Sequence, residues 1–189
     1  DPVTEQQTLF AFDQPQKFLS TYAYVHYLFE DQAGTFWLYA FEGLVRASPN
    51  AKGYRVDYFK NNPANPTSLF NNFVLSMADD PLEPERYLWV GTKVGLDRLD
   101  KSAGTFKHFG VAQGLPDNVV YGILSDNSGH LWMSTNKGLC RFHVRDETAK
   151  NFTLADGLQS DEFNQGSYLK TQDGALIFGG VNGLTVFYP

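Results

Sequence analysis

One short unit recurs along this chain and restricts the fold more than any other feature. In its clearest copy, residues 119–142, apolar β-formers lead into a turn at 126–129 and a second strand begins near Leu131. A third strand follows the turn at 136–138. Each copy has an aromatic residue in its second strand, at Trp37, Trp89, Trp132 and Phe178. Each copy also has a Gly-Leu pair where the third strand begins, with glycines 43, 95, 138 and 183. A period of roughly 40–50 residues built from short strands predicts the blades of a β-propeller.

The chain holds about four such units, and we expect its 189 residues to form a single propeller segment. The expected blades span residues 18–60, 70–110, 116–155 and 160–189. The last unit ends after its third strand, and residues 8–12 resemble one isolated strand. Propellers avoid open sheet edges by completing a blade from both chain ends. The predicted fold class is therefore all-β: a partial or small β-propeller of about four blades of four antiparallel strands, the last completed by the N-terminal strand.

A row of about four blades can close in two ways, and the sequence leaves both open. An isolated arc would expose the apolar faces of its end blades, which favours association. The chain either closes on itself as a four-bladed ring or pairs with a second copy as a homodimer. In both arrangements Leu9, Phe10 and Phe12 complete the last blade. We favour the pair slightly, because the small ring needs steeper packing between blades.

Charge and motif content argue against several function classes. The net charge is −6 and Lys and Arg form no cluster, so we expect no nucleic-acid partner. No nucleophile elbow, zinc-protease motif or phosphate loop is present, which favours a non-catalytic protein without a cofactor. The four histidines fall on different predicted strands and turns, so we expect no metal site. The single cysteine, Cys140, lies in a predicted strand as a packed, inert thiol.

The units resemble the two-component regulator propeller repeat. Residues 88–100 and 131–142 follow the Leu-Trp-x-Gly-Thr…Gly-Leu-x-Arg pattern of that family, with Ser134 at the first glycine of the second copy. Residues 156–166 and 178–189 resemble the terminal blade of such sensors. The resemblance implies a periplasmic sensor segment coupled to a histidine kinase or diguanylate cyclase, with membrane attachment only through other parts of the parent protein. Many relatives detect oligosaccharides, so it also implies an oligosaccharide or another small polar ligand.

Candidate ligand contacts are expected at one mouth of the propeller. The connector into each first strand and the turn between the second and third strands should share that face. The polar residues there that we predict to bind ligand are Asn72, Lys93, Asn118, Asn136, Glu162, Asn164 and Asn182. Asn71, Asp117, Asp161 and Lys137 lie beside them in sequence. Amides and charges of this kind hydrogen-bond polar ligands. A protein-interaction scaffold remains the alternative, and a propeller glycosidase or lyase is a third, weaker interpretation.

Overall fold

The computed structural model describes residues 25–40, 43–51 and 53–189, which form antiparallel sheets with two short 3₁₀ turns. Three sheets have four strands each and the fourth has three. We number these sheets blades 1 to 4 in chain order. The strands are β1 Val25–Glu30, β2 Phe36–Ala40, β3 Gly43–Asn50, β4 Gly53–Phe59, β5 Val74–Asp79, β6 Tyr87–Thr92, β7 Leu96–Asp100, β8 Thr105–Phe109, β9 Gly122–Ser125, β10 His130–Thr135, β11 Gly138–His143, β12 Thr148–Phe152, β13 Phe163–Lys170, β14 Leu176–Gly180 and β15 Gly183–Phe187.

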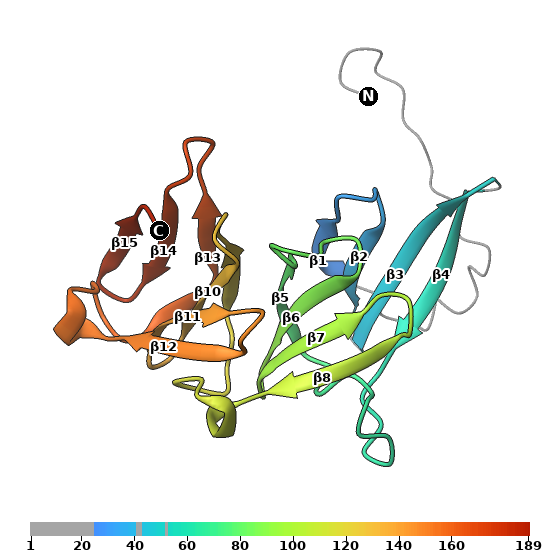
Figure 1. Ribbon diagram of the computed structural model, residues 1–189, viewed down its shortest axis with the longest axis horizontal. Helices are drawn as coiled ribbons and strands as arrows, with labels where there is room; N and C mark the ends of the chain where they lie inside the picture. The colour runs from blue at the N-terminus through green and yellow to red at the C-terminus, as the bar shows by residue number, and fades with distance from the viewer. Residues whose placement is uncertain (1–24, 41–42, 52) are drawn as a thin grey trace.

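The four blades fan out around their first strands, β1, β5, β9 and β13 (Figure 1). Within each blade the strands follow one another outward in chain order. This confirms the predicted all-β propeller architecture. The predicted strand at 8–12 lies outside the described residues, so completion of the last blade stays a prediction. In the described part of the chain, β15 pairs only with β14.

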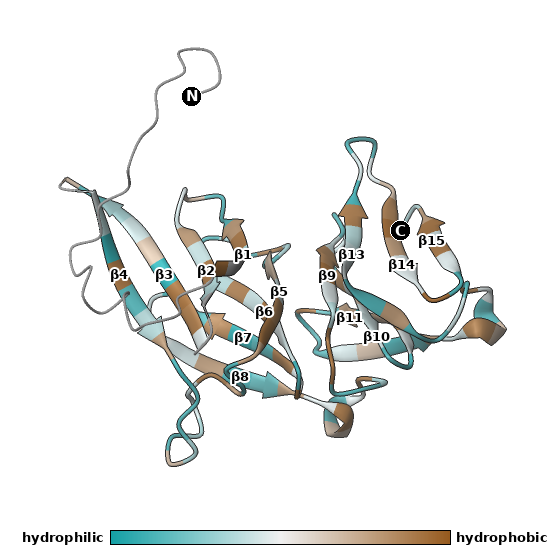
Figure 2. Ribbon diagram, turned by 180° about the vertical axis from the view of Figure 1, so that it is seen from behind, coloured by the Kyte–Doolittle hydropathy of each residue, from teal (hydrophilic) through white to brown (hydrophobic). Residues whose placement is uncertain are grey.

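Hydrophobic clusters fill the spaces between adjacent blades, and apolar residues recur along the strands of every sheet (Figure 2). The repeated aromatics Trp37, Trp89 and Phe178 are fully buried, and Trp132 is 8% exposed. Each belongs to one of these clusters, as the repeat predicts. An aromatic side chain of this size removes about 150–250 Å² from water, so these positions join each blade to its neighbour.

An aspartate stabilises the turn before each repeated tryptophan through hydrogen bonds. In blade 1, Asp31 Oδ1 accepts backbone N–H bonds from Ala33 and Thr35, and Oδ2 accepts the indole N–H of Trp37. Blades 2 and 3 repeat this arrangement: Trp89 donates to Asp80 at 2.7 Å and Trp132 donates to Asp126 at 3.0 Å. The sequence predicts the Asx turns at 31–34 and 126–129. The bond from the turn to the indole is a further feature, seen only in the structure.

Blade 4 departs from this pattern because its aromatic residue has no N–H group. Phe178 stands where the other blades have tryptophan, and Asp173 is exposed. The Asp173 carboxylate instead accepts from the hydroxyls of Thr171 and Tyr188. These hydroxyl bonds lower the pKa of Asp173. The blade thus keeps the aspartate turn but loses its link to the core.

Two close contacts hold the inner strands together. The Tyr168 ring of β13 packs so tightly on Gly122 of β9 that a Cβ at residue 122 would collide with it. The Tyr168 hydroxyl also lies 2.9 Å from the hydroxyl of Tyr27 on β1. Burial raises the pKa of Tyr168, with a smaller contribution from Tyr27. The first and fourth blades therefore meet at the centre of the arc.

A short 3₁₀ turn follows the outermost strand of blade 3. That strand runs Thr148–Phe152, and Leu154–Asp156 form the turn. This turn closes at Gly157, which has a left-handed φ of 95°. A similar 3₁₀ turn, Val111–Gln113, ends at Gly114. In both connectors the glycine stops the turn, because left-handed backbone is accessible to glycine without strain.

Candidate functional site

The connectors and turns that carry the predicted ligand residues do lie together, blade by blade. In blade 2 the backbone N–H of Lys93 donates to Phe73 O, and the Lys93 ammonium lies 4.5 Å from the centre of the Phe73 ring. The Phe73 side chain is 45% exposed. An exposed aromatic ring beside a cation presents both an apolar surface and a charge to a ligand.

Blade 3 brings four polar side chains together at the same place. The Tyr121 hydroxyl donates to Asn136 Oδ1 at 2.9 Å, and Lys137 Nζ lies 4.0 Å from Asp117 Oδ2. Asn136 and Lys137 are exposed. Asn136 keeps both amide N–H donors for other partners, since the bond to Tyr121 uses only its oxygen.

In blade 4, Gln159 connects the two segments. Its Oε1 accepts from the backbone N–H of Asn182, and its Nε2 lies 3.4 Å from Glu162 O. Val181 N–H also donates to Glu162 O. The side chains of Glu162, Asn164 and Asn182 are exposed around this connection.

Other predicted positions have a structural use that turn chemistry explains. Asn72 Oδ1 accepts from Asn61 N–H, and Asn118 Oδ1 lies 3.4 Å from Val111 N. Asn71, Asp117 and Asp161 likewise accept backbone N–H groups of the connectors. Short polar side chains commonly bond to nearby backbone in this way. Lys93, Asn136, Glu162, Asn164 and Asn182 are thus the more available members of the predicted set.

A histidine that the sequence analysis left without a role fixes the connector into blade 2. His108 Nδ1 lies 2.7 Å from the buried carboxylate of Asp97, Nε2 lies 2.9 Å from Pro66 O, and the ring stacks on Phe70. The hydrogen bond with Asp97 raises the pKa of His108, and burial opposes this. Burial raises the pKa of Asp97, while hydrogen bonds from His108 and Phe70 oppose that rise. Because both partners of the ring are acceptors, the geometry suits an imidazolium with two N–H donors.

A mostly buried lysine joins blades 1 and 2. Lys101 Nζ donates to Asp31 Oδ2 at 2.8 Å, to Asp79 Oδ1 at 3.1 Å and to Pro84 O at 2.7 Å. Burial acts to raise the pKa of Asp31, but hydrogen bonds from Lys101 and Trp37 bring it below its usual value. Burial raises the pKa of Asp79, although Lys101 opposes the rise. The three charged side chains form a network within the interface between the two blades. The sequence does not predict this network, because the three residues lie far apart along the chain.

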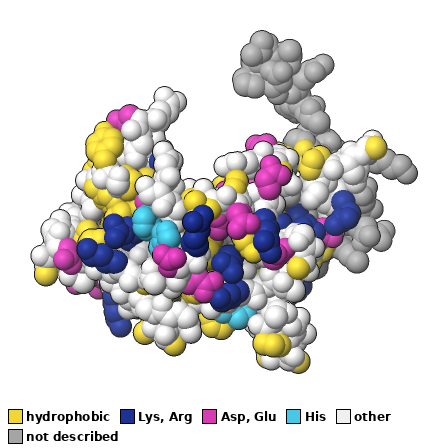
Figure 3. Space-filling view, viewed as in Figure 1, with side chains coloured by type: hydrophobic (Ala, Val, Ile, Leu, Met, Phe, Trp, Pro, Cys, Tyr) yellow, Lys and Arg dark blue, Asp and Glu magenta, His cyan; other side chains and the backbone are white. Residues whose placement is uncertain are grey.

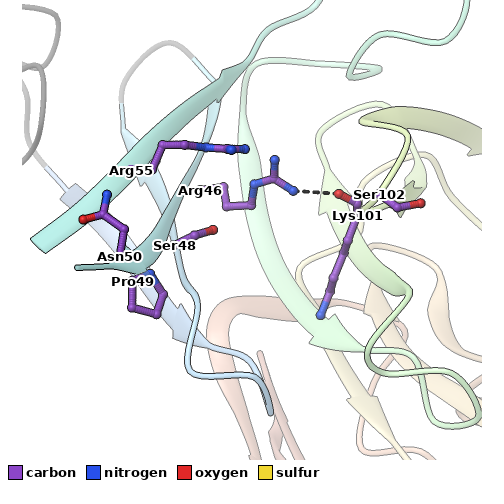
Figure 4. A pocket seen from close by; sticks show the side chains of 7 residues that line it. All are labelled: Arg46, Ser48, Pro49, Asn50, Arg55, Lys101 and Ser102. Atoms are coloured by element: carbon purple, nitrogen blue, oxygen red, sulfur yellow. Dashed lines mark hydrogen bonds between the residues drawn. The ribbon is translucent and has the colours of Figure 1, made fainter. Parts of the chain in front are cut away.

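A polar pocket of about 410 Å³ lies at the outer side of the groove between blades 1 and 2. Figure 3 shows basic and acidic side chains alternating in a band across the outer strands on this side. Strands β3 and β4 supply most of the pocket wall, and the turn after β7 supplies the rest (Figure 4). The lining residues are Arg46, Ser48, Pro49, Asn50, Arg55, Lys101 and Ser102. Sequence analysis missed this pocket because its two walls are brought together only by blade packing.

In residues 25–40, 43–51 and 53–189, no group of three or more His, Cys, Asp or Glu side chains is placed to hold a metal ion. In the same part of the chain, no helix has the length and apolar character needed to cross a membrane.

Comparison with known proteins agrees with the blade architecture. The model of the family "Two component regulator propeller" matches residues 114–137, the connector and first two strands of blade 3. No curated protein matches the chain in sequence. The extracellular domain of hybrid two component system BT3049 from B. thetaiotaomicron is similar in structure, with a TM-score of 0.71 and 21% identity over 89% of this chain. PorZ, a surface component of the type-IX secretion system of Porphyromonas gingivalis, gives a TM-score of 0.72 and 18% identity over 99% of this chain.

Propeller enzymes also share the fold. Virginiamycin B lyase from Staphylococcus aureus gives a TM-score of 0.59 and 17% identity, over 88% of this chain and 56% of the lyase. The chain spans 23% of the BT3049 chain and 28% of the PorZ chain. The blades thus define a segment of β-propeller. The chain carries a two component regulator propeller repeat, and the resemblance predicted from the sequence is confirmed.

Proposed function

We propose that this chain is a non-catalytic ligand-recognition segment of an extracellular sensor propeller in a bacterial signalling receptor. The observation that carries the proposal is the regulator propeller repeat at residues 114–137. The likeness to extracellular domains of two component systems supports the same class. Such a segment lies on the periplasmic or outer side of the membrane, and the parent receptor provides the attachment and the output module.

The proposed ligand is a carbohydrate or another small polar molecule that binds at the mouth. The exposed ring of Phe73 offers a stacking surface, and Lys93, Asn136 and Asn182 surround the mouth with donors and acceptors. Mouth residues from several blades can contact one ligand, which couples ligand binding to the packing between blades.

A thermal-shift screen with neutral and acidic oligosaccharides tests this proposal. A ligand present at 100 times its Kd stabilises a protein by about 2.7 kcal/mol, so a true ligand raises the melting temperature measurably. The variants Lys93→Ala and Asn136→Ala should lose the shift, while Lys150→Ala, an exposed position on an outer strand, should keep it. Absence of a shift with every sugar, together with capture of a defined partner protein, would favour the alternative below.

The alternative is a propeller that binds another protein and no small molecule. The likeness to PorZ, a surface component of a secretion system, favours this possibility. A propeller glycosidase or lyase is a third interpretation, suggested by the likeness to virginiamycin B lyase. Consumption of a sugar or lactone substrate by the chain, followed by product analysis, would identify such an enzyme.

A further inference from the structure

The grooves between blades 1 and 2 and between blades 2 and 3 each contain an arginine in the same register, but the residue paired with it on the outermost strand differs: Asp57 in the first groove and Lys107 in the second. Arg46 and Arg98 occupy the same register, because each pairs across the sheet with the repeated tryptophan of its blade. Each guanidinium also lies over that tryptophan ring, at 5.8 Å from Trp37 and 5.6 Å from Trp89. The two arginines therefore point into equivalent places.

The groove between blades 2 and 3 is closed by a carboxylate from the neighbouring blade. Glu147 Oε1 lies 3.3 Å from Arg98 Nη1, and Lys107 Nζ lies 2.6 Å from Glu147 Oε2. Glu147 is the last residue of the turn between β11 and β12, where it has a left-handed φ of 55°. The Glu147 carboxylate of blade 3 thus pairs with two cations of blade 2.

The groove between blades 1 and 2 lacks that acid. The turn between β7 and β8 has the same length, and its last residue is Gly104 with a φ of 68°. Glycine has no side chain to place in the groove, and the 410 Å³ pocket opens beside this turn. Arg46 there bonds to Lys101 O and shares Asp57 with Arg55.

Among the residues that the structure describes, the charges in this pocket leave a positive excess. Arg46 and Arg55 both donate to the single oxygen Asp57 Oδ2, so one carboxylate faces two guanidinium groups. The Lys101 ammonium is directed to Asp31 and Asp79 and so is already compensated. Two guanidinium groups carry ten N–H donors, and the bonds above use four of them. The Arg55 side chain is 64% exposed, so its remaining donors are open to a ligand.

We propose that this pocket binds the carboxylate of a small hydroxylated acid, such as a sugar acid, in the place that Glu147 fills in the next groove. Arg46 and Arg55 hold the carboxylate, since guanidinium and carboxylate form paired hydrogen bonds. The hydroxyls of Ser48 and Ser102 line the same pocket and suit the hydroxyl groups of the ligand. The site lies on the outer strands, so it does not depend on the mouth residues of the proposed function.

Titration of the full 189-residue chain with sodium glucuronate, followed by calorimetry or NMR at constant ionic strength, tests the site. We expect saturable one-to-one binding, and no binding of neutral methyl glucoside at the same concentration. Arg55→Gln should weaken glucuronate binding about tenfold. Arg145→Gln removes an exposed arginine from another turn and should leave the affinity unchanged.

A matched pair at Gly104 makes the decisive comparison. Gly104→Glu recreates the carboxylate of Glu147 and should abolish glucuronate binding, whereas Gly104→Gln carries the same backbone strain without the charge and should retain it. Equal effects of the two changes, unchanged affinity in Arg55→Gln, or equal binding of methyl glucoside would each overturn the proposal. Asn136→Ala should not alter glucuronate binding, so loss of the mouth site and loss of this pocket are distinguishable.

Discussion

The indole Nε1 of Trp89 donates to Asp80 Oδ2 at 2.7 Å, and both side chains are buried. The same carboxylate also accepts the backbone N–H groups of Leu82 and Glu83 through Oδ1. One side chain therefore fixes both the turn and the orientation of the core aromatic. Since the pair recurs in blades 1 to 3, its removal should weaken each of these blades in a similar way.

Replacing Trp89 by Phe should cost about 1–3 kcal/mol of unfolding free energy, because Asp80 Oδ2 is left buried without its donor. Urea denaturation measures this change. The same ring without a donor already stands in blade 4, where Phe178 has no aspartate partner. Phe178→Leu is a suitable comparison, since it alters packing and removes no hydrogen bond. An unchanged urea midpoint in Trp89→Phe would show that the bond contributes nothing.

Trp132→Ala should destabilise the protein by about 3–5 kcal/mol, since it opens a cavity between blades 3 and 4. The ring packs on Phe152 and Phe187, with the centre of the Phe187 ring 4.5 Å away. The unfolding midpoint in urea is the measurement. A midpoint close to that of the wild type would contradict a core role.

Lys101→Met should lower the free energy of unfolding, although Lys101 lies in a turn. The substitution leaves Asp31 and Asp79 facing one another without a cation, and breaking a buried pair costs about 3–5 kcal/mol. Lys150→Met, on an exposed outer strand, should change stability by less than about 0.5 kcal/mol. Equal unfolding midpoints for the two variants would show that the network does not contribute to stability.

Stability should fall as the pH rises above about 6.5, the ordinary pKa of histidine. The Asp97 bond raises the folded-state pKa of His108, so the folded protein holds a proton there that the unfolded chain releases. The contribution is complete below the unfolded pKa and is lost as the pH passes through the folded pKa. Denaturation at a series of pH values measures the slope, and His108→Gln should remove this part of it.

The thiol of Cys140 should not react with Ellman's reagent in the native protein. Cys140 is fully buried, and burial raises its pKa to about 12. Reactive cysteines need thiolate character and exposure, and this residue has neither. In urea the same thiol should react at once, which provides the control. Rapid labelling of the native chain would show that blades 2 and 3 open at their interface.

Closure of the arc remains a prediction about residues 1–24. Deleting residues 1–13 should lower the melting temperature, because β15 would lose the strand expected from Leu9, Phe10 and Phe12. If two copies pair through this strand, light scattering should also show the mass moving toward the monomer or an aggregate. An unchanged melting temperature and mass would exclude the split blade.

The sequence predicts the blades because the repeat is local. Trp37, Trp89, Trp132 and Phe178 each recur with a turn before and a Gly-Leu pair after, and that pattern gives strand order and core position together. The network of Lys101 and the outer pocket are different. Their residues come from separate blades, and no spacing in the sequence indicates which turns face one another. Gly104 and Glu147 become comparable only once the strand pairing is known.

The mouth residues fall between these cases. Connector and turn geometry brings their segments together, as the strand order predicts. Whether a side chain is available to a ligand depends on which of its atoms already hydrogen-bond to neighbouring backbone groups. Asn72 and Asn118 accept N–H groups of their own connectors, whereas Asn136 accepts a tyrosine hydroxyl from the connector that leads into its own blade. Residue type alone does not distinguish these three amides.

The bond between Tyr27 and Tyr168 spans 141 residues of sequence, while strand pairs within each blade are local. Local hairpins form quickly, whereas bringing distant residues together requires closing a long loop. The two hydroxyls can meet only after the intervening blades have stacked in order. This contact is therefore expected among the last to form during folding.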